Sequence, residues 1–186
     1  MIVLGIDPGT AITGYGVVCT DRGIGFAKSG AGAPRQNEIA PQGAARLVEC
    51  GVIRTSPRAP LASRLHDIFE GVTELIERHQ PDALAVEDVF FARNVRTTVV
   101  LGHARGVVLL AGARAGVTIH EYAPALIKKT VVGRGAATKE QVQFMVARLL
   151  RLKTAPQPAD AADGVACALT CVMSAGTAML RLRVAG

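Results

Sequence analysis

The hydrophobic pattern of the N-terminal part predicts short β-strands. Residues 2–6 form an apolar run that ends at the turn sequence Asp7-Pro8-Gly9-Thr10, and residues 14–19 form a second run after a hairpin-like connection. Residues 48–54 could supply a third strand. Residues 25–45, which lie between, are rich in Gly, Ala, Pro and Gln and have weak periodicity. We interpret this stretch as a loop or insertion.

From residue 61 the apolar positions recur at helical spacing. They are Leu61, Leu65, Ile68, Val72, Leu75 and Ile76. Pro81-Asp82 ends this predicted helix. Residues 83–86 are then wholly apolar, which is typical of a strand covered on both faces, and Glu87 follows at the strand's C-terminal end.

The remaining elements are mostly helical. We predict a helix over about 95–115 with a small-residue face, a strand over 117–122 and a short helix over 124–132. Thr138 and Gln141 form a capping-box signal for a helix to about residue 152. The last helix is predicted over about 159–175. The small-residue face (Gly102, Ala104, Gly106, Ala111 and Gly112) would let another backbone approach closely.

This order of elements, β-β-β-α-β-α-β-α-α-α, predicts an α/β fold with a mixed sheet flanked by helices. The chain has no internal repeat and no linker that would divide it. We therefore expect residues 1–186 to form a single domain with a tail of a few residues at the C-terminus.

Composition narrows the class of protein. A hydrophobic content of 49% argues against disorder, and no apolar run is long enough to cross a bilayer. The N-terminal run lacks a basic leader, so we expect a soluble, cytoplasmic protein without membrane contact. The net charge of +6 fits a polyanionic partner, although a basic solvated surface explains it equally well.

The four cysteines and four histidines give little sign of chemistry. The cysteines contain no CxxC pair, and Cys167 and Cys171 have apolar neighbours, so reduced core thiols are the expectation. None of the histidines is next to the acids considered below in sequence.

Asp7 and Glu87 both follow apolar strands. Asp7 could be a structural turn residue, because Asp and Gly favour turns. Glu87 stands where an interior strand leaves the core, an edge at which α/β sheets often bind ligands. Its neighbour Asp88 would point to the opposite face. Strand alternation by itself leaves open which of Glu87 and Asp88 faces a site.

Asp160 and Asp163 stand three residues apart at the start of the last predicted helix, so they share a helix face. A helix N-terminus favours acids, and capping alone could explain the pair. The neighbouring residues are nearly all Ala, Val, Leu or Cys, however. A helix this apolar is packed on more than one face. Simple exposure to solvent is therefore a poor explanation for the two acids on it.

Together the four acids resemble a site for hard cations. Magnesium prefers oxygen ligands and uses few protein carboxylates per ion. Two ions about 4 Å apart can activate a water and stabilise the leaving oxygen in phosphodiester hydrolysis. The candidate ligands are Asp7, Glu87, Asp160 and Asp163.

At this point the chain resembles the RuvC family, the bacterial Holliday-junction resolvases of the retroviral-integrase (RNase H-like) superfamily. The resemblance covers nearly the whole length apart from 25–45 and the last few residues. It is carried by Gly5-Ile6-Asp7-Pro8-Gly9-Thr10, Thr13-Gly14-Tyr15-Gly16, Val86-Glu87-Asp88-Val89-Phe90, Thr130-Val131-Val132-Gly133, and 156–163.

The resemblance implies an RNase H-like mixed five-stranded sheet and a crossover junction endodeoxyribonuclease of DNA recombination and repair. It implies that Asp7, Glu87, Asp160 and Asp163 are catalytic metal ligands, and it selects Glu87 over Asp88. Two Mg²⁺ ions per site are implied, with Mn²⁺ as a substitute.

The resemblance also implies roles in DNA binding. Phe90 would stack on a base, and Lys128 and Lys139 would contact the scissile region. Without it, Phe90 would be interpreted as a core aromatic and the lysines as solvated surface. The implied partners are four-way junction DNA, a second copy of the chain in a homodimer, and the branch-migration complex of RuvA and RuvB.

Three alternatives are open. Another RNase H-like nuclease could cut RNA–DNA hybrids, and a non-catalytic junction-binding protein could use its acids structurally. An actin-like ATPase also begins with a strand followed by Asp-x-Gly-Thr, but it needs a second phosphate-binding half and about twice this length. One departure from the family pattern is Gly164, which follows Asp163 where a helix former would be more ordinary and which could ease the close approach of backbone or metal.

Overall fold

The computed structural model describes residues 1–21, 45–88 and 95–184, with side chains described up to Ser174. The strands are β1 (Ile2–Asp7), β2 (Ile12–Cys19), β3 (Arg46–Arg54), β4 (Ala83–Glu87) and β5 (Thr118–Tyr122). The helices are α1 (Leu61–His79), α2 (Val95–Arg114), α3 (Pro124–Val132), α4 (Lys139–Leu149) and α5 (Ala159–Val184).

The strands form one mixed five-stranded sheet in the order β3-β2-β1-β4-β5. The first three are antiparallel neighbours, whereas β4 runs parallel to β1 and β5 runs parallel to β4. The predicted hairpin is confirmed, since Asp7 at the end of β1 pairs with Gly14 in β2. The expectation of a mixed sheet flanked by helices is also confirmed.

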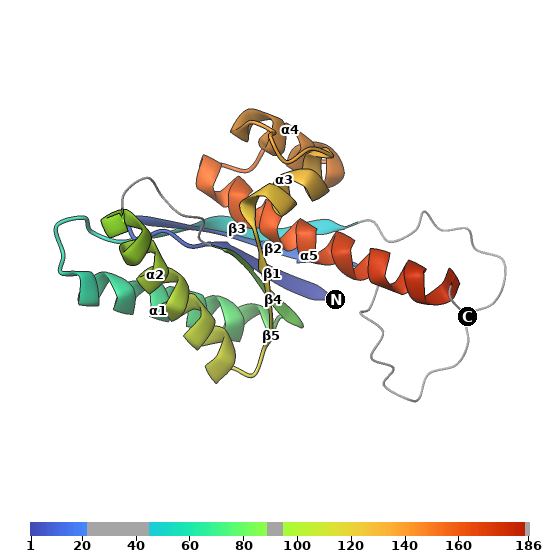
Figure 1. Cartoon of the computed structure of the whole chain (residues 1–186). Coiled ribbons are helices and arrows are strands. Elements are labelled where there is room, and N and C mark those ends of the chain that lie inside the picture. The colour runs from blue at the N-terminus through green and yellow to red at the C-terminus, as the bar shows by residue number, and fades with distance from the viewer. Residues whose placement is uncertain (22–44, 89–94, 185–186) are drawn as a thin grey trace.

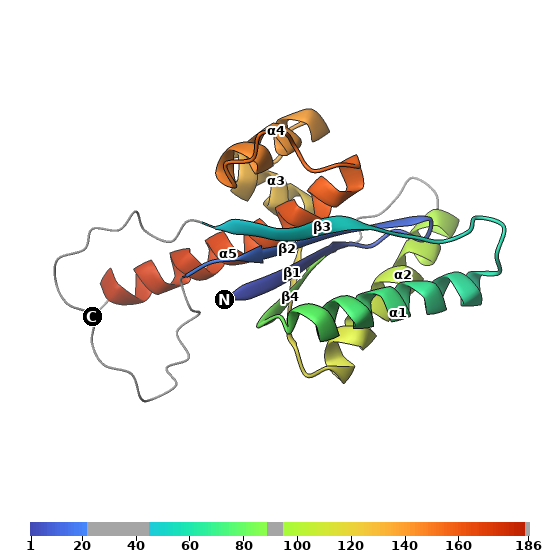
Figure 2. The same cartoon turned by 180° about the vertical axis from the view of Figure 1, so that it is seen from behind.

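Helices cover both faces of the sheet. Helices α1 and α2 pack on one face, while α5 crosses the other face with α3 and α4 outside it (Figure 1). The same three layers are visible from behind in Figure 2. Each face has its own buried cluster: Leu4, Ile6 and Val86 belong to the α1–α2 side, and Val3 and Ala85 belong to the α5 side. Because both faces are buried, the strands are apolar at successive positions instead of alternating with polar ones.

The ends of two helices differ from the predictions. Helix α4 ends at Leu149, not at about residue 152. Arg151 adopts a left-handed backbone (φ 54°), and the chain turns so that Leu152 still packs against the core. An apolar position can thus be buried without continuing the helix. The end predicted for the last helix, at about residue 175, is also wrong, because α5 continues to Val184. Gly176 costs about 1 kcal/mol of helix stability, which is too little to end a long helix.

The small residues of α2 divide between two environments. Ala104, Ala111 and Gly112 are buried against the sheet, and a Cβ at Gly112 would lie 2.6 Å from the Leu84 side chain. Gly102 and Gly106 are exposed, and a Cβ added at either would have nothing within 4 Å. One face of α2 therefore packs closely against side chains of the sheet and the other is open, so the close approach of another backbone stays a prediction.

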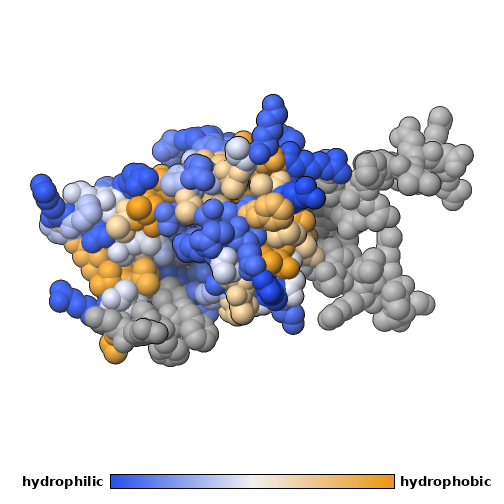
Figure 3. All heavy atoms as spheres, turned by 90° about the horizontal axis from the view of Figure 1, so that it is seen from above, coloured by the Kyte–Doolittle hydropathy of each residue, from blue (hydrophilic) through white to orange (hydrophobic). Residues whose placement is uncertain are grey.

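The face seen from above mixes hydrophilic and hydrophobic side chains (Figure 3). Among the described residues, no helix combines the length and the apolar content that a membrane crossing requires. Most of the 25–45 stretch lies outside the described residues.

Candidate active site

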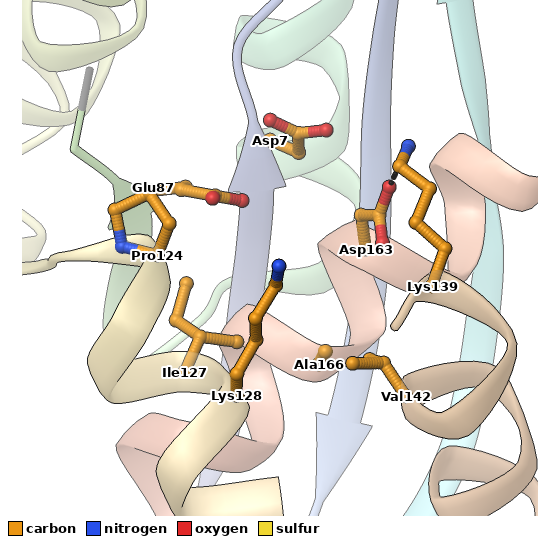
Figure 4. A pocket seen from close by; sticks show the side chains of 9 residues that line it. All are labelled: Asp7, Glu87, Pro124, Ile127, Lys128, Lys139, Val142, Asp163 and Ala166. Atoms are coloured by element: carbon orange, nitrogen blue, oxygen red, sulfur yellow. Dashed lines mark hydrogen bonds and ion pairs between the residues drawn. The ribbon is translucent and has the colours of Figure 1, made fainter. Parts of the chain in front are cut away.

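Asp7 and Glu87 lie side by side at one edge of the sheet. The parallel register that pairs Ile6 with Val86 places these two acids at the ends of neighbouring strands. Strand alternation turns both side chains toward the α5 face, the side of Val3 and Ala85. Both line one pocket (Figure 4). Strand β1 ends here because the chain leaves the sheet at Pro8-Gly9.

The first turns of α5 bring two more acids to the same edge. Single carboxylate oxygens of Asp7, Asp160 and Asp163 lie within 4.8 Å of one another. Asp163 also lines the pocket with Asp7 and Glu87, whereas Asp160 lies beside it. The structure therefore brings all four predicted acids together, with Asp7, Asp160 and Asp163 in a tight group and Glu87 next to Asp7.

Glycines allow α5 to approach β1 and β2 this closely. A Cβ at Gly164 would lie 2.5 Å from the Tyr15 backbone, and one at Gly14 would lie 1.9 Å from the Asp160 carbonyl oxygen. Gly5 and Gly16 meet the same helix. The helical glycine after Asp163 thus has a packing reason, namely the close backbone approach that its departure from the family pattern suggested. This close packing of α5 on the sheet places Asp160 and Asp163 near Asp7 at the end of β1.

Burial and mutual repulsion perturb the acids. Burial, followed by the charge of Asp163, raises the pKa of Asp7 to about 6. Burial, followed by the charge of Asp7, raises the pKa of Glu87 to about 8. Carboxylates that are buried and close together lose hydration and repel one another when all of them are ionised. A bound cation would stabilise their charged forms.

Lysines complete the pocket. Lys128 and Lys139 both line it, and Lys139 Nζ donates a hydrogen bond to Asp163 Oδ2 at 2.9 Å. The apolar part of the lining consists of Pro124, Ile127, Val142 and Ala166. The predicted lysines therefore lie beside the acids, on α3 and at the start of α4 (Figure 4).

Asp88 points away from this pocket. Its carboxylate forms an ion pair with Arg105 of α2 at 3.2 Å, and Arg105 also pairs with Glu121 of β5. The structure thus separates two adjacent acids onto opposite faces of the sheet, with Glu87 in the pocket and Asp88 at α2.

The side-chain hydrogen bonds that hold the turn after Asp7 were not predicted. The Thr13 hydroxyl donates to the Gly9 carbonyl at 2.7 Å, and Arg64 Nε donates to the Thr10 carbonyl at 3.1 Å. The Thr55 hydroxyl also donates to the Thr10 carbonyl. Thr13 could have been suspected from its place in the Thr-Gly-Tyr-Gly segment. Arg64 has no comparable signal, because its partner lies 54 residues away.

The other predicted residues have simple outcomes. Phe90 lies outside the described residues. Cys167 and Cys171 are free and buried, as expected of core thiols, and the tight acid group contains neither His nor Cys among the residues described. His79 instead bonds Glu49 at 2.8 Å.

Comparison with known proteins gives a consistent result. The family model described as crossover junction endodeoxyribonuclease RuvC matches residues 37–171. A curated relative of that name from Desulforamulus reducens is 44% identical over 169 residues, covering 91% of each chain.

Solved structures agree. The RuvC structure from Thermus thermophilus has a TM-score of 0.78 and 38% identity, covering 96% of this chain and 97% of the other. A structure of T. thermophilus RuvC in complex with a Holliday junction substrate has a TM-score of 0.77 and 35% identity, covering 95% and 96%. The family model matches most of the chain, and the relatives match it over nearly their whole length. This chain therefore belongs to the RuvC family of crossover junction endodeoxyribonucleases.

Proposed function

We propose that this chain resolves four-way DNA junctions by paired symmetric nicks, using Asp7, Glu87, Asp160 and Asp163 to hold two Mg²⁺ ions per active site. Membership of the RuvC family gives the class of activity, the hydrolysis of DNA phosphodiester bonds at crossover junctions. The observation that carries the assignment of residues is the convergence of three acids from β1, β4 and α5 on one pocket flanked by two lysines, with Asp160 grouped with Asp7 and Asp163.

The donor set fits hard divalent cations. It consists of carboxylate oxygens, three of which already lie within 4.8 Å of one another. The raised pKa values of Asp7 and Glu87 reflect burial together with crowded negative charge, which a cation would relieve. Mn²⁺, which accepts the same ligands, should substitute for Mg²⁺.

When bound, such ions would polarise the scissile phosphate and lower the pKa of an attacking water. The chain's own residues would orient and hold the substrate. Lys128 and Lys139, which line the pocket beside the acids, would bind phosphate oxygens and offset their negative charge. The apolar lining from Ile127 and Val142 would exclude bulk water beside the acids. A base stacked on Phe90 is proposed from the resemblance alone.

A homodimer would supply the second nick, and α2 offers a surface for it. Val95, Val99 and Leu110 are 78%, 52% and 54% exposed. With the open Gly102 and Gly106 they fall on a single helix face, because their spacing follows the helical repeat. Exposed apolar side chains beside glycines would let two copies of α2 pack closely.

Three further parts of the proposal follow the expectations from the sequence. A single nuclease domain over 1–186 and action in the cytoplasm were expected from the pattern of the chain, and a partnership with the branch-migration complex of RuvA and RuvB is implied by the resemblance.

The decisive experiment is Asp7→Asn. We expect cleavage of a synthetic four-way junction in Mg²⁺ to fall by at least about 100-fold, because a cation ligand is lost. Junction binding, measured by gel shift in Ca²⁺, should stay intact or tighten as repulsion from the DNA is relieved. Normal cleavage by this variant would exclude Asp7 as a catalytic ligand.

Substrate comparison separates the alternatives. A junction resolvase should nick the four-way junction symmetrically and leave an RNA–DNA hybrid of matched length intact. Preferential cutting of the hybrid would favour another RNase H-like nuclease. Binding indifferent to Mg²⁺, with no nicks in any substrate, would favour a non-catalytic junction-binding protein.

A further inference from the structure

Lys139 is inserted among the proposed metal ligands. Its ammonium bonds Asp163 at 2.9 Å, and the Asp163 side chain is only 15% exposed. Figure 4 shows the ammonium directed at Asp163, beside Asp7. A cation therefore already contacts one of the acids that are proposed to bind metal.

The charge of Lys139 acts on the whole acid cluster. It lowers the pKa of both Asp7 and Glu87, opposing their burial. In return, a hydrogen bond to Asp163 raises the pKa of Lys139, with further contributions from Asp160 and Asp7. The ammonium thus neutralises a cluster and not a single partner.

The backbone at Lys139 is fixed while its side chain has room to move. Lys139 is the first residue of α4, directly after the N-cap Thr138, whose capping box with Gln141 secures the helix start. The lysine side chain is 61% exposed. Its ammonium can leave Asp163 by rotation of the side chain alone, without unwinding α4.

Lys128 provides a contrast. It lines the same pocket, and its charge also lowers the pKa of Glu87. Among the described residues it forms no ion pair with an acid. One lysine is thus bonded to the acid cluster and the other stands near it.

We propose that Lys139 is the resident counter-ion of the metal site. Its ammonium holds Asp163 while the site lacks a divalent cation, and binding of the cation releases it toward the phosphate at the pocket mouth. This inference rests on the proposed function, because it needs Asp7, Asp160 and Asp163 to bind metal. Lys139 would then become available to bind phosphate only when the site holds the metal ions that cleavage needs.

The physical basis is competition between cations for one set of carboxylates. An ammonium at hydrogen-bond distance from Asp163 repels a divalent ion among the same oxygens. Two ligands that oppose each other at one site weaken each other by the same factor. Removal of the ammonium should therefore tighten metal binding and destabilise the metal-free protein.

The test compares Lys139→Met with Lys128→Met, which removes a charge from the same pocket without breaking an ion pair. Affinity for Mg²⁺ and Ca²⁺ is measured by calorimetry without DNA, and Tm is measured in chelator. K139M should bind metal at least about fivefold more tightly than the unmodified chain and have a lower metal-free Tm. K128M should change the metal affinity by less than about twofold.

A second measurement reports the release directly. With ¹³C-labelled lysine, the Lys139 Cε resonance, identified by its loss in K139M, should shift on Ca²⁺ addition more than that of Lys128. Equal affinity gains in both variants, unchanged or weaker binding by K139M, or an unmoved Lys139 resonance would overturn the counter-ion role.

The outcomes also separate this inference from the proposed function. If the unmodified chain binds metal and cuts junctions while K139M binds metal no more tightly, only the counter-ion role fails. If neither the unmodified chain nor K139M binds metal, the proposed metal site fails and the counter-ion role fails with it.

Discussion

At the scale of single residues, burial and neighbouring negative charges raise the pKa values of Glu87 and Asp7. The pKa of Glu87 rises from 4.5 to about 8, and that of Asp7 rises from 3.8 to about 6. Between about pH 4 and pH 8 the folded, metal-free protein therefore binds more protons at these acids than the unfolded chain does. The free energy of unfolding falls as pH rises through a window in which the folded state holds extra protons.

The expected outcome is a metal-free Tm that is higher at pH 6 than at pH 8.5. Glu87→Gln should flatten this difference and raise the Tm at pH 8.5 by at least about 2 °C, because the amide carries no charge to desolvate or repel. Thermal unfolding in chelator at both pH values measures this. A larger pH dependence in E87Q would contradict the assignment of the raised pKa.

Gly164 shows what a single missing methyl group permits. A Cβ at this position would meet the Tyr15 backbone, whereas one at Gly71 of α1 would meet the end of the Ile53 side chain, at 2.9 Å. Both glycines lie in helices, so alanine gains similar helix propensity at each. The two sites differ in whether the neighbour can move.

Gly164→Ala should therefore lower the free energy of unfolding by about 1–3 kcal/mol, as overpacking against a fixed backbone does. Gly71→Ala should be close to neutral, because the Ile53 side chain can rotate. Denaturant titration of both variants checks the difference. Equal stability of the two would mean that α5 can shift away from β2 at little cost.

At the scale of elements, the end of β4 sorts its two acids to opposite faces. Glu87 joins the pocket beneath α5, and Asp88 pairs with Arg105 on α2. The covered strand before them has apolar residues on both faces, so its sequence does not mark which face holds the site.

Adjacent isosteric substitutions test this sorting. Glu87→Gln should reduce junction cleavage by at least about 100-fold, whereas Asp88→Asn should retain it within about tenfold, since it changes only a partly exposed ion pair at α2. Single-turnover cleavage in Mg²⁺ is the measurement. The reverse ranking would show that Asp88 supplies the metal ligand.

At the scale of the whole molecule, the exposed face of α2 predicts association. Val99→Asp should raise the dimer dissociation constant by at least about tenfold, because it places a charge in an apolar contact. Val48→Asp is the matched control, since Val48 is 42% exposed on β3, outside this face. Sedimentation over a concentration series measures both. Equal effects of the two variants would remove α2 from the interface.

Local pattern was sufficient for the elements of this fold. Apolar runs gave the strands, helical spacing gave α1, and the capping box placed the start of α4 at Thr138. These signals are local, because hydrogen bonding and side-chain periodicity involve near neighbours. The ends of α4 and α5 were predicted wrongly, because α4 stops at Leu149 before a left-handed residue at Arg151 and α5 continues past Gly176.

The sequence by itself determined the set of elements and, through its motifs, the four candidate acids. Only the tertiary structure decided which face Glu87 takes, how Gly5, Gly14, Gly16 and Gly164 bring α5 onto the sheet, and which lysine bonds the acid cluster. The physical reason is distance along the chain. Asp7 meets Glu87 through the parallel pairing of β1 with β4, and it meets Asp163 through the packing of α5 on the sheet, contacts that no local pattern encodes.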